Sequence, residues 1–134
     1  MGKRLNIMLV MADQLSALAL RQYGSTIAKT PNIDRLAKHG IVLPAAYCNN
    51  PICASSRVAL WTGRLATRVN VFDNGHEFAA NHPTIAHYLR NLGYRTVAVG
   101  KMHFIGPDQL HGFEERLNSE IYPSNFNYSE FRNS

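Results

Sequence analysis

A cysteine and an arginine lie four positions apart where a proline-marked loop gives way to an apolar segment. The loop reads Pro-Ile-Cys-Ala-Ser-Ser-Arg over residues 51–57, and Val-Ala-Leu-Trp-Thr-Gly-Arg follows it. The small residues around Cys53 suit the start of a helix, whose free N–H groups favour negative charge. Arg57 comes one helical turn later and returns its guanidinium to the same side. The spacing therefore predicts a nucleophile, Cys53, next to an anion clamp, Arg57.

Four other residues could take part in chemistry at such a site. Asp13 directly follows an apolar run, where a carboxylate either caps the next helix or binds a hard cation such as Ca²⁺ or Mg²⁺. Lys101 and His103 are two apart in a segment expected to be extended, so their side chains should point the same way. A lysine there can neutralise an anionic oxygen, and a histidine can move a proton near neutral pH. Asn74 lies in a predicted turn, where it could contact the anion or serve the turn alone.

The elements that must position these residues alternate between apolar runs and amphipathic segments. Three runs are predicted as strands, namely residues 5–11, 41–47 and 94–99. Three segments are predicted as helices, namely residues 31–40, 53–62 and 83–93. This order predicts an α/β fold with a mostly parallel sheet flanked by helices, in which ligands bind beyond the carboxyl ends of the strands. Because Asp13, Cys53 and Lys101 each follow one of the strands, we expect them at one edge of the sheet.

Length and composition indicate one globular domain or part of one. The chain has 134 residues, of which 46% are hydrophobic and 17% charged. No apolar run approaches the roughly 18 residues of a membrane helix, so we expect no membrane partner. Residues 1–4 lead directly into the first apolar run, and Cys48 and Cys53 lie too close to staple distant elements. We therefore expect a cytoplasmic protein.

The net charge of +5 is unevenly distributed along the chain. Residues 1–106 hold 12 Lys and Arg against 4 Asp and Glu, while residues 107–134 hold 2 against 5. A basic body suits an anionic substrate or nucleic acid. The basic residues are scattered singly, without interleaved aromatic residues, so we expect no nucleic-acid partner. The pattern divides the chain into an α/β core piece, residues 1–106, and a turn-rich acidic tail, residues 107–134.

The cysteine segment resembles the signature of the sulfatase family, Cys-x-Pro-x-Arg ending in Thr-Gly-Arg. The matching positions are Cys53, Arg57, Thr62, Gly63 and Arg64. Ser55 stands where the family usually has proline, and Gln14 stands where it often has a second aspartate beside Asp13. The run Thr-Pro-Asn-Ile-Asp-Arg-Leu-Ala over residues 30–37 is another hallmark of the family, which we interpret as a structural helix start. Residues 101–116, with Ala-Asp-Gln at 12–14, look like the choline-sulfatase branch.

The resemblance implies the N-terminal part of an alkaline-phosphatase-like sulfatase domain, and a sulfuric ester hydrolase acting on a small anionic ester such as choline sulfate. It implies that a formylglycine-generating enzyme oxidises Cys53 to formylglycine, and that Asp13 and residue 53 bind Ca²⁺ or Mg²⁺. One hydroxyl of the hydrated aldehyde attacks sulfur and the alcohol leaves, after which the second hydroxyl expels sulfate. The roles implied for the other residues are electrostatic clamps at Arg57 and Lys101, a base at His103, and substrate contacts at Lys101, His103 and Asn74.

Sulfatases are several times longer than this chain, and the resemblance places further metal ligands, a second histidine and a second lysine in later segments. We therefore expect a truncated or split sulfatase with little activity alone, which would associate as an oligomer or with a complementing chain through an exposed sheet edge. Two alternatives stay open. One is a phosphate or phosphonate monoester hydrolase of the same superfamily, and the other is a sulfatase remnant without catalysis.

Overall fold

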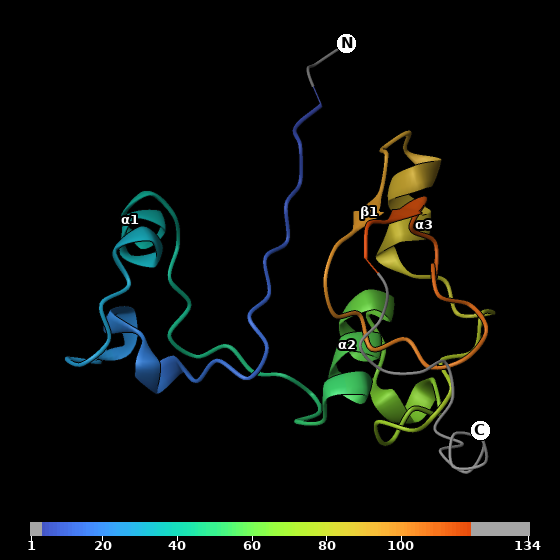
Figure 1. The fold of residues 1–134 in the computed structure, drawn as a ribbon, viewed down its shortest axis with the longest axis horizontal. Helices are drawn as coiled ribbons and strands as arrows, with labels where there is room; N and C mark the ends of the chain where they lie inside the picture. Colours follow the sequence, from blue (N-terminus) through green and yellow to red (C-terminus); the bar gives the residue numbers. More distant parts are fainter. Residues whose placement is uncertain (1–3, 119–134) are drawn as a thin grey trace, which may run out of the picture. The chain divides into compact units, whose positions relative to one another are not determined.

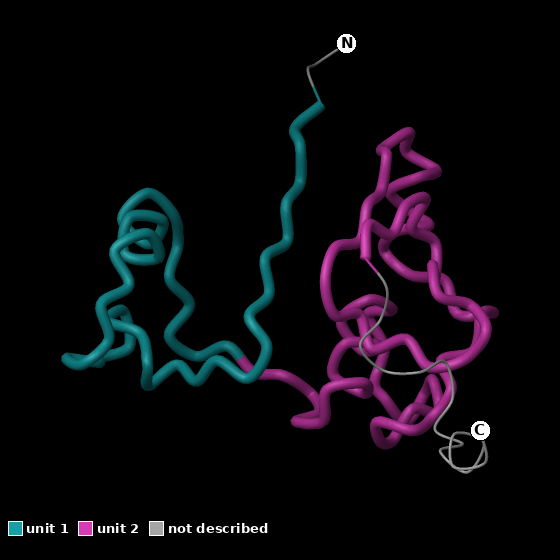
Figure 2. The backbone as a smooth tube through the Cα atoms, in the orientation of Figure 1, with its two compact units in different colours: residues 1–46 teal, residues 47–134 magenta. Residues whose placement is uncertain are grey.

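The computed structural model of the chain describes residues 4–118. The chain divides into two compact units, unit 1 over residues 1–46 and unit 2 over residues 47–134 (Figure 2).

Unit 1 contains two short 3-10 helices and one α-helix. They are η1 (Ala17–Ala19), η2 (Arg21–Tyr23) and α1 (Pro31–His39) (Figure 1). Proline at the first position of α1 suits a helix start because its missing N–H would have no partner there in any case. The helix predicted over residues 31–40 is thus confirmed.

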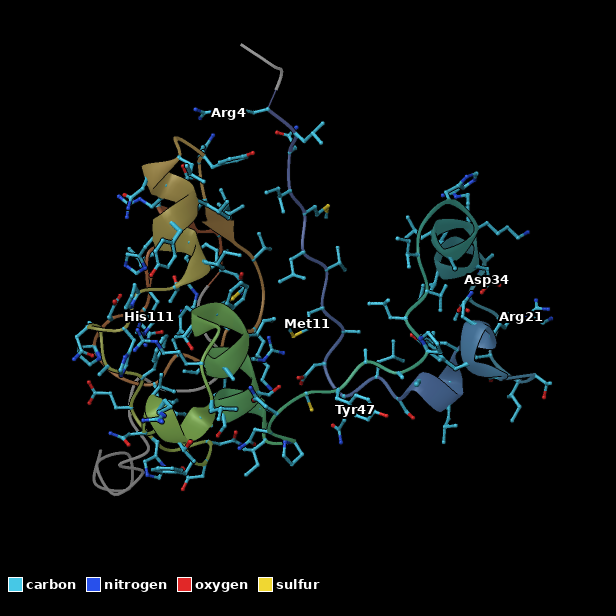
Figure 3. All side chains as sticks on the ribbon, turned by 180° about the vertical axis from the view of Figure 1, so that it is seen from behind. Arg4, Met11, Arg21, Asp34, Tyr47 and His111 are labelled. Atoms are coloured by element: carbon cyan, nitrogen blue, oxygen red, sulfur yellow. The ribbon has the colours of Figure 1, made fainter. Side chains whose placement is uncertain are left out.

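Asp34 connects η2 to the first turn of α1. Its Oδ1 accepts hydrogen bonds from Gln22 Nε2 at 2.6 Å and Thr30 Oγ1 at 3.1 Å, and its Oδ2 lies 4.0 Å from Arg21 Nη1 (Figure 3). The carboxylate also lies at the end of the helix that favours negative charge. The structural interpretation of residues 30–37 is consistent with these contacts.

The strands predicted over residues 5–11 and 41–47 are wrong for the described residues. The first run is drawn out without regular structure, with Met11 projecting from it (Figure 3), and the second forms a turn and irregular chain. A strand exists only where a neighbouring strand accepts its hydrogen bonds. Among residues 4–46, no other extended segment pairs with either run. Their apolar side chains consequently stay exposed, and unit 1 has no buried residue over its described part.

Unit 2 holds the remaining described elements. They are α2 (Cys53–Thr62), η3 (Ala66–Arg68), α3 (Ile85–Asn91), β1 (Val97–Ala98) and β2 (Glu115–Arg116). β1, labelled in Figure 1, pairs in parallel with β2, and Val97 lies opposite Glu115. β1 occupies the centre of the strand predicted over residues 94–99. β2 lies in the segment predicted as an acidic tail, and the division of the chain at residue 106 stays a prediction.

Both helices of unit 2 begin and end where the sequence indicates. α2 ends at Gly63, which has φ 66°, a left-handed conformation that glycine adopts without steric cost. α3 begins after Thr84, whose backbone N–H donates to the His87 ring at 3.1 Å. The helices predicted over residues 53–62 and 83–93 are therefore confirmed to within about two residues at their ends.

The core of unit 2 forms around the buried face of α2. Trp61 packs edge-on against Phe113, with ring centroids 5.3 Å apart. The buried apolar cluster consists of Ala54, Val58, Trp61, Val69, Val71, Phe78, Ala98, Met102 and Phe104. These side chains come from α2 and from the segments around residues 70, 78 and 100, so the core fixes those segments against the helix.

Candidate active site

Cys53 is the first residue of α2, and its thiol is half-buried and unbridged. The loop before it is held by Asn50, whose side-chain oxygen accepts the Ile52 N–H at 2.8 Å. The first hydrogen bond of the helix then runs from the Ser56 N–H to the Ile52 carbonyl at 2.8 Å. The prediction that Cys53 opens a helix is confirmed, and the positive end of the helix dipole favours negative charge there.

Asn74 reaches the same helix start from a separate loop. Its Oδ1 accepts the backbone N–H of Ala54, the second residue of α2, at 3.1 Å. The turn that carries it is formed by Asp73, whose Oδ1 accepts the N–H groups of Gly75 at 2.8 Å and His76 at 3.1 Å. The hydrogen bond from Gly75, followed by the one from the His76 ring, lowers the pKa of Asp73. The structure thus joins Asn74 to the start of α2, whether or not it also contacts a substrate.

Arg57 links α2 to the segment that carries Lys101 and His103. The Arg57 side chain is almost fully buried, and its Nη1 donates to the Lys101 carbonyl oxygen at 2.7 Å. A guanidinium has five N–H donors in a planar arrangement, so it can bind more than one acceptor at a time. Three parts of the chain that the sequence predicts to cooperate therefore meet around the first two turns of α2.

Lys101 and His103 do not share one environment. Lys101 is half-buried, whereas His103 is 1% exposed and both of its ring nitrogens are shielded from solvent. The expectation that both lie in an extended segment is wrong at His103, which has φ 58°. A left-handed residue bends the chain, so the two-residue alternation of a strand does not apply. The proton-transfer role of His103 stays a prediction.

Asp13 lies in unit 1, so its position beside residue 53 stays a prediction. It does not cap η1, because Ser16 does so by accepting the Leu18 N–H at 3.3 Å. Among the described residues, no group of three or more His, Cys, Asp and Glu side chains is arranged to hold a metal ion. Ca²⁺ takes six to eight oxygen ligands and Mg²⁺ six. The described donors alone therefore do not make up a divalent metal site.

Sequence reasoning missed a buried aromatic group around His111. The His111 ring is fully buried, stacks on Phe78 with centroids 3.9 Å apart, and meets Phe104 edge-on at 4.5 Å. Burial lowers the pKa of His111 to about 4, although the charge of Asp108 opposes the shift. His111 lies in the midst of the packed side chains of unit 2 in Figure 3. Only the close spacing of aromatic residues and histidines could have indicated this cluster.

Sequence reasoning also missed the polar contacts of Gln109 and Arg116. Gln109 Nε2 donates to the carbonyl oxygens of Phe104 at 2.9 Å and Gly106 at 2.8 Å. Arg116 Nη1 donates to the Gln109 side-chain oxygen at 2.9 Å. Both residues fall in the run 101–116, in which no sequence pattern indicates which side chains bind the main chain.

The family of the chain follows from its similarity to known proteins. The sequence profile of the sulfatase family matches residues 5–134. The chain belongs to the sulfatase family. It is 43% identical over 124 residues to a choline-sulfatase of Rhizobium meliloti (strain 1021), covering 92% of this chain and 24% of the relative. It is 37% identical to an N-acetylgalactosamine-6-sulfatase of Sus scrofa, covering 85% of this chain and 25% of the relative.

A solved structure supports the same assignment for this sulfatase segment. A crystal structure of a protein assigned to the sulfatases from Bacteroides thetaiotaomicron VPI-5482 matches with a TM-score of 0.69 and 30% identity. The match covers 84% of this chain and 26% of the solved one. The predicted α/β class is therefore confirmed, with the described residues forming an incomplete, N-terminal portion of the fold. The chain spans about a quarter of the length of the curated relatives it matches.

No helix among the described residues is both long enough and apolar enough to span a bilayer. The cytoplasmic location stays a prediction.

Proposed function

We propose that this segment carries the nucleophile and part of the anion-binding site of a sulfuric ester hydrolase, with choline sulfate as its substrate. The substrate follows from the 43% identity to a choline-sulfatase, and from residues 101–116, which resemble that branch. Relatives at lower identity are named for sulfated sugars, such as N-acetylgalactosamine-6-sulfate and iduronate 2-sulfate. Hydrolysis of a sulfate ester is the reaction common to these names.

One observation supports the proposal most strongly. Cys53 begins α2 as a half-buried, unbridged thiol, and hydrogen bonds to two distant segments hold the helix around it. Asn74 binds the N–H of the adjacent residue, and Arg57 binds the main chain of Lys101. A nucleophile position, a helix N-terminus and the Arg57 guanidinium lie on one helix, and the main chain of Lys101 is bound to it. Together with the Lys101 side chain, which we propose faces the same site, they form the set that an anionic ester requires.

Oxidation of Cys53 to formylglycine would supply a hydrated aldehyde as the nucleophile. A half-buried thiol at a helix start, unbridged to Cys48, fits that modification. Under the proposal the side chains of Lys101 and Arg57 stabilise the negative charge on the sulfuryl oxygens. Asn74 holds the helix start in place and lends its side-chain N–H₂ to the anion, and His103 moves the proton that accompanies release of sulfate.

Ca²⁺ or Mg²⁺ belongs to the proposal as a bound cation, with Asp13 and residue 53 as two of its oxygen ligands. Because the described donors are too few for such a site, we assign no catalytic step to the cation. Residues outside this segment would supply the other ligands. The chain alone should consequently turn over little or no substrate.

A chimera provides the test of this function. In it, residues 5–118 replace the matching N-terminal part of the Rhizobium meliloti choline-sulfatase, and the protein is produced together with a formylglycine-generating enzyme. We expect hydrolysis of choline sulfate and of an aryl sulfate at rates well above those for an aryl phosphate. Cys53→Ala should reduce kcat by at least about 10³-fold, because the nucleophile is lost. Arg95→Gln, which removes only an exposed ion pair with Glu115, is the matched control and should leave kcat unchanged.

Three outcomes would contradict the proposal. A preference for the phosphate ester would favour a phosphate or phosphonate monoester hydrolase. Equal rates in the parent chimera and Cys53→Ala would remove residue 53 from the chemistry. A folded chimera that lacks turnover, with an intact thiol at residue 53, would favour a remnant without catalysis.

A further inference from the structure

We propose that Gln109 is a positioning residue, which fixes the main chain around His103 and thereby sets where Lys101 and His103 stand relative to the start of α2. The role of Lys101 and His103 at that position rests on the proposed function, whereas the contacts that hold them there are independent of it.

His103 has a conformation that its neighbours must hold in place. Its φ of 58° is left-handed, a backbone conformation that is unfavourable for a residue with a side chain. Strain of this kind persists only where the surrounding structure determines the backbone on both sides. The structure shows such contacts on each side of His103.

The contact before His103 comes from α2, and the contacts after it come from Gln109 and Phe78. Arg57 Nη1 holds the Lys101 carbonyl at 2.7 Å. Gln109 Nε2 donates to the Phe104 carbonyl at 2.9 Å, and the Phe78 N–H donates to the Ile105 carbonyl at 2.9 Å. The carbonyl oxygens of residues 101, 104 and 105 are all engaged, so the stretch from Met102 to Phe104, with His103 at its centre, is anchored at both ends.

Arg116 fixes the orientation of the Gln109 amide. Its Nη1 donates to Gln109 Oε1 at 2.9 Å and to the Gln109 carbonyl at 3.1 Å. The amide oxygen must face this cation, so the N–H₂ must face the two carbonyl oxygens of Phe104 and Gly106. Arg116 itself belongs to β2 and lies over the Phe104 ring, 5.8 Å from its centroid. Gln109 thus connects the segment around His103 to the parallel strand pair.

Two substitutions distinguish the role of the Gln109 side-chain N–H₂ from the role of its side-chain oxygen. Gln109→Glu keeps an oxygen for Arg116 but places a carboxylate against two carbonyls, whereas Gln109→Met keeps the volume and removes both functions. Arg95→Gln is the control, since it removes an exposed ion pair from the same strand pair without touching residues 101–106. All four proteins are full 134-residue chains, compared at conditions where each is at least nine-tenths folded by Trp61 fluorescence.

Nuclear magnetic resonance of His103 gives the first result. We expect both Gln109 variants to shift the His103 ring signals and the amide signals of Phe104 and Ile105, while Arg95→Gln leaves them at the wild-type positions. Wild-type His103 signals in a folded Gln109→Glu chain would overturn the proposal. A shift in Gln109→Met without one in Gln109→Glu would also overturn it, because the Arg116 contact alone would then position the segment. If neither Gln109 variant folds, hydrogen exchange of the His103 and Phe104 amides is measured in Gln109→Asn. Faster exchange than in the wild type would support the proposal, and unchanged exchange would overturn it.

Titration with inorganic sulfate separates this inference from the proposed function. In the wild type, sulfate should shift the Ala54 amide and the Lys101 signals, and in Gln109→Glu its affinity should fall about tenfold because Lys101 is displaced. Absence of any sulfate effect in the wild type would count against the proposed anion site, while the His103 signals would still decide the role of Gln109. Equal sulfate affinity in both proteins would contradict the claim that Gln109 sets the position of Lys101.

Discussion

Units 1 and 2 contain similar kinds of apolar residues but bury them to different extents. In unit 2, Val71 and Phe104 are fully buried, whereas in unit 1 Met8 and Val10 are 87% and 78% exposed. The difference follows from how each segment finds partners. Unit 2 packs α2 against loops and a strand of the same unit. The runs 5–11 and 41–47 of unit 1 have the composition of inner strands but no neighbouring strands among the described residues of their unit. A hydrophobic run therefore indicates that its side chains favour burial. Whether they are buried depends on the segments that lie next to the run.

This contrast bears on the site. The residues expected at the helix start, Cys53, Asn74, Arg57 and Lys101, belong to the unit that builds its own core. Asp13 belongs to the unit that does not. We therefore expect the nucleophile half of the site to be ordered by this segment itself, and the metal half to depend on further contacts.

The largest expected effect tests the contrast directly. Phe104→Ala should lower the free energy of unfolding of unit 2 by about 3–5 kcal/mol, because it leaves a cavity in the core. Leu9→Ala in unit 1 should change it by less than about 0.5 kcal/mol, since Leu9 is exposed. Urea unfolding followed by fluorescence of the single Trp, Trp61, measures both. Equal losses in the two variants would remove the distinction between the units.

The next effect is a pH dependence that belongs to unit 2. Burial lowers the pKa of His111 from 6.5 to about 4, so the folded state binds its proton less readily than the unfolded state does. The stability it contributes is fully present above pH 6.5, and up to about 3 kcal/mol of it is lost as the pH falls to 4. Urea midpoints measured between pH 7 and 4 should show this loss, and His111→Phe should remove most of it. If the urea midpoint of His111→Phe falls with pH as steeply as that of the wild type, other groups cause the pH dependence.

A smaller effect is expected at the start of α2. Asn74→Ala leaves the Ala54 N–H without its acceptor and should destabilise unit 2 by about 1 kcal/mol. Asn91→Ala, at the last residue of α3, makes no such contact and is the matched control. Thermal unfolding of the two variants measures the difference. Equal stability of both would show that Asn74 does not hold the helix start.

An effect of similar size but opposite sign concerns the residue that departs from the family signature. Ser55 is fully buried, and its hydroxyl has no hydrogen-bond partner among the described residues. Ser55→Ala should therefore raise the stability of unit 2 by about 1 kcal/mol, while Ser56→Ala, at a half-buried position, should leave it nearly unchanged. A loss of stability in Ser55→Ala would mean that the hydroxyl has a stabilising contact.

Helices were predictable from the sequence because their signals are local. Pro31, Thr84 and Gly63 mark ends that depend only on the residues around them. Strands were not predictable over residues 5–11 and 41–47, because strand pairing depends on residues far away in the chain. The left-handed backbone conformation of His103 was not predictable either, because Arg57 and Gln109 hold the chain around it from two other segments. The helix start at Cys53 was predictable because its signals lie within a few residues, whereas the role of Arg57 as an anion clamp stays a prediction.

The central claim is that residue 53 is the nucleophile position of a sulfatase. The most direct test is the mass of the tryptic peptide over residues 39–57, after the chain is produced together with a formylglycine-generating enzyme. Conversion of the thiol to the aldehyde should lower that mass by about 18 Da, and the loss should be absent in Cys53→Ala and retained in Cys48→Ser. An unaltered mass, or a loss that follows Cys48 instead of Cys53, would contradict the account.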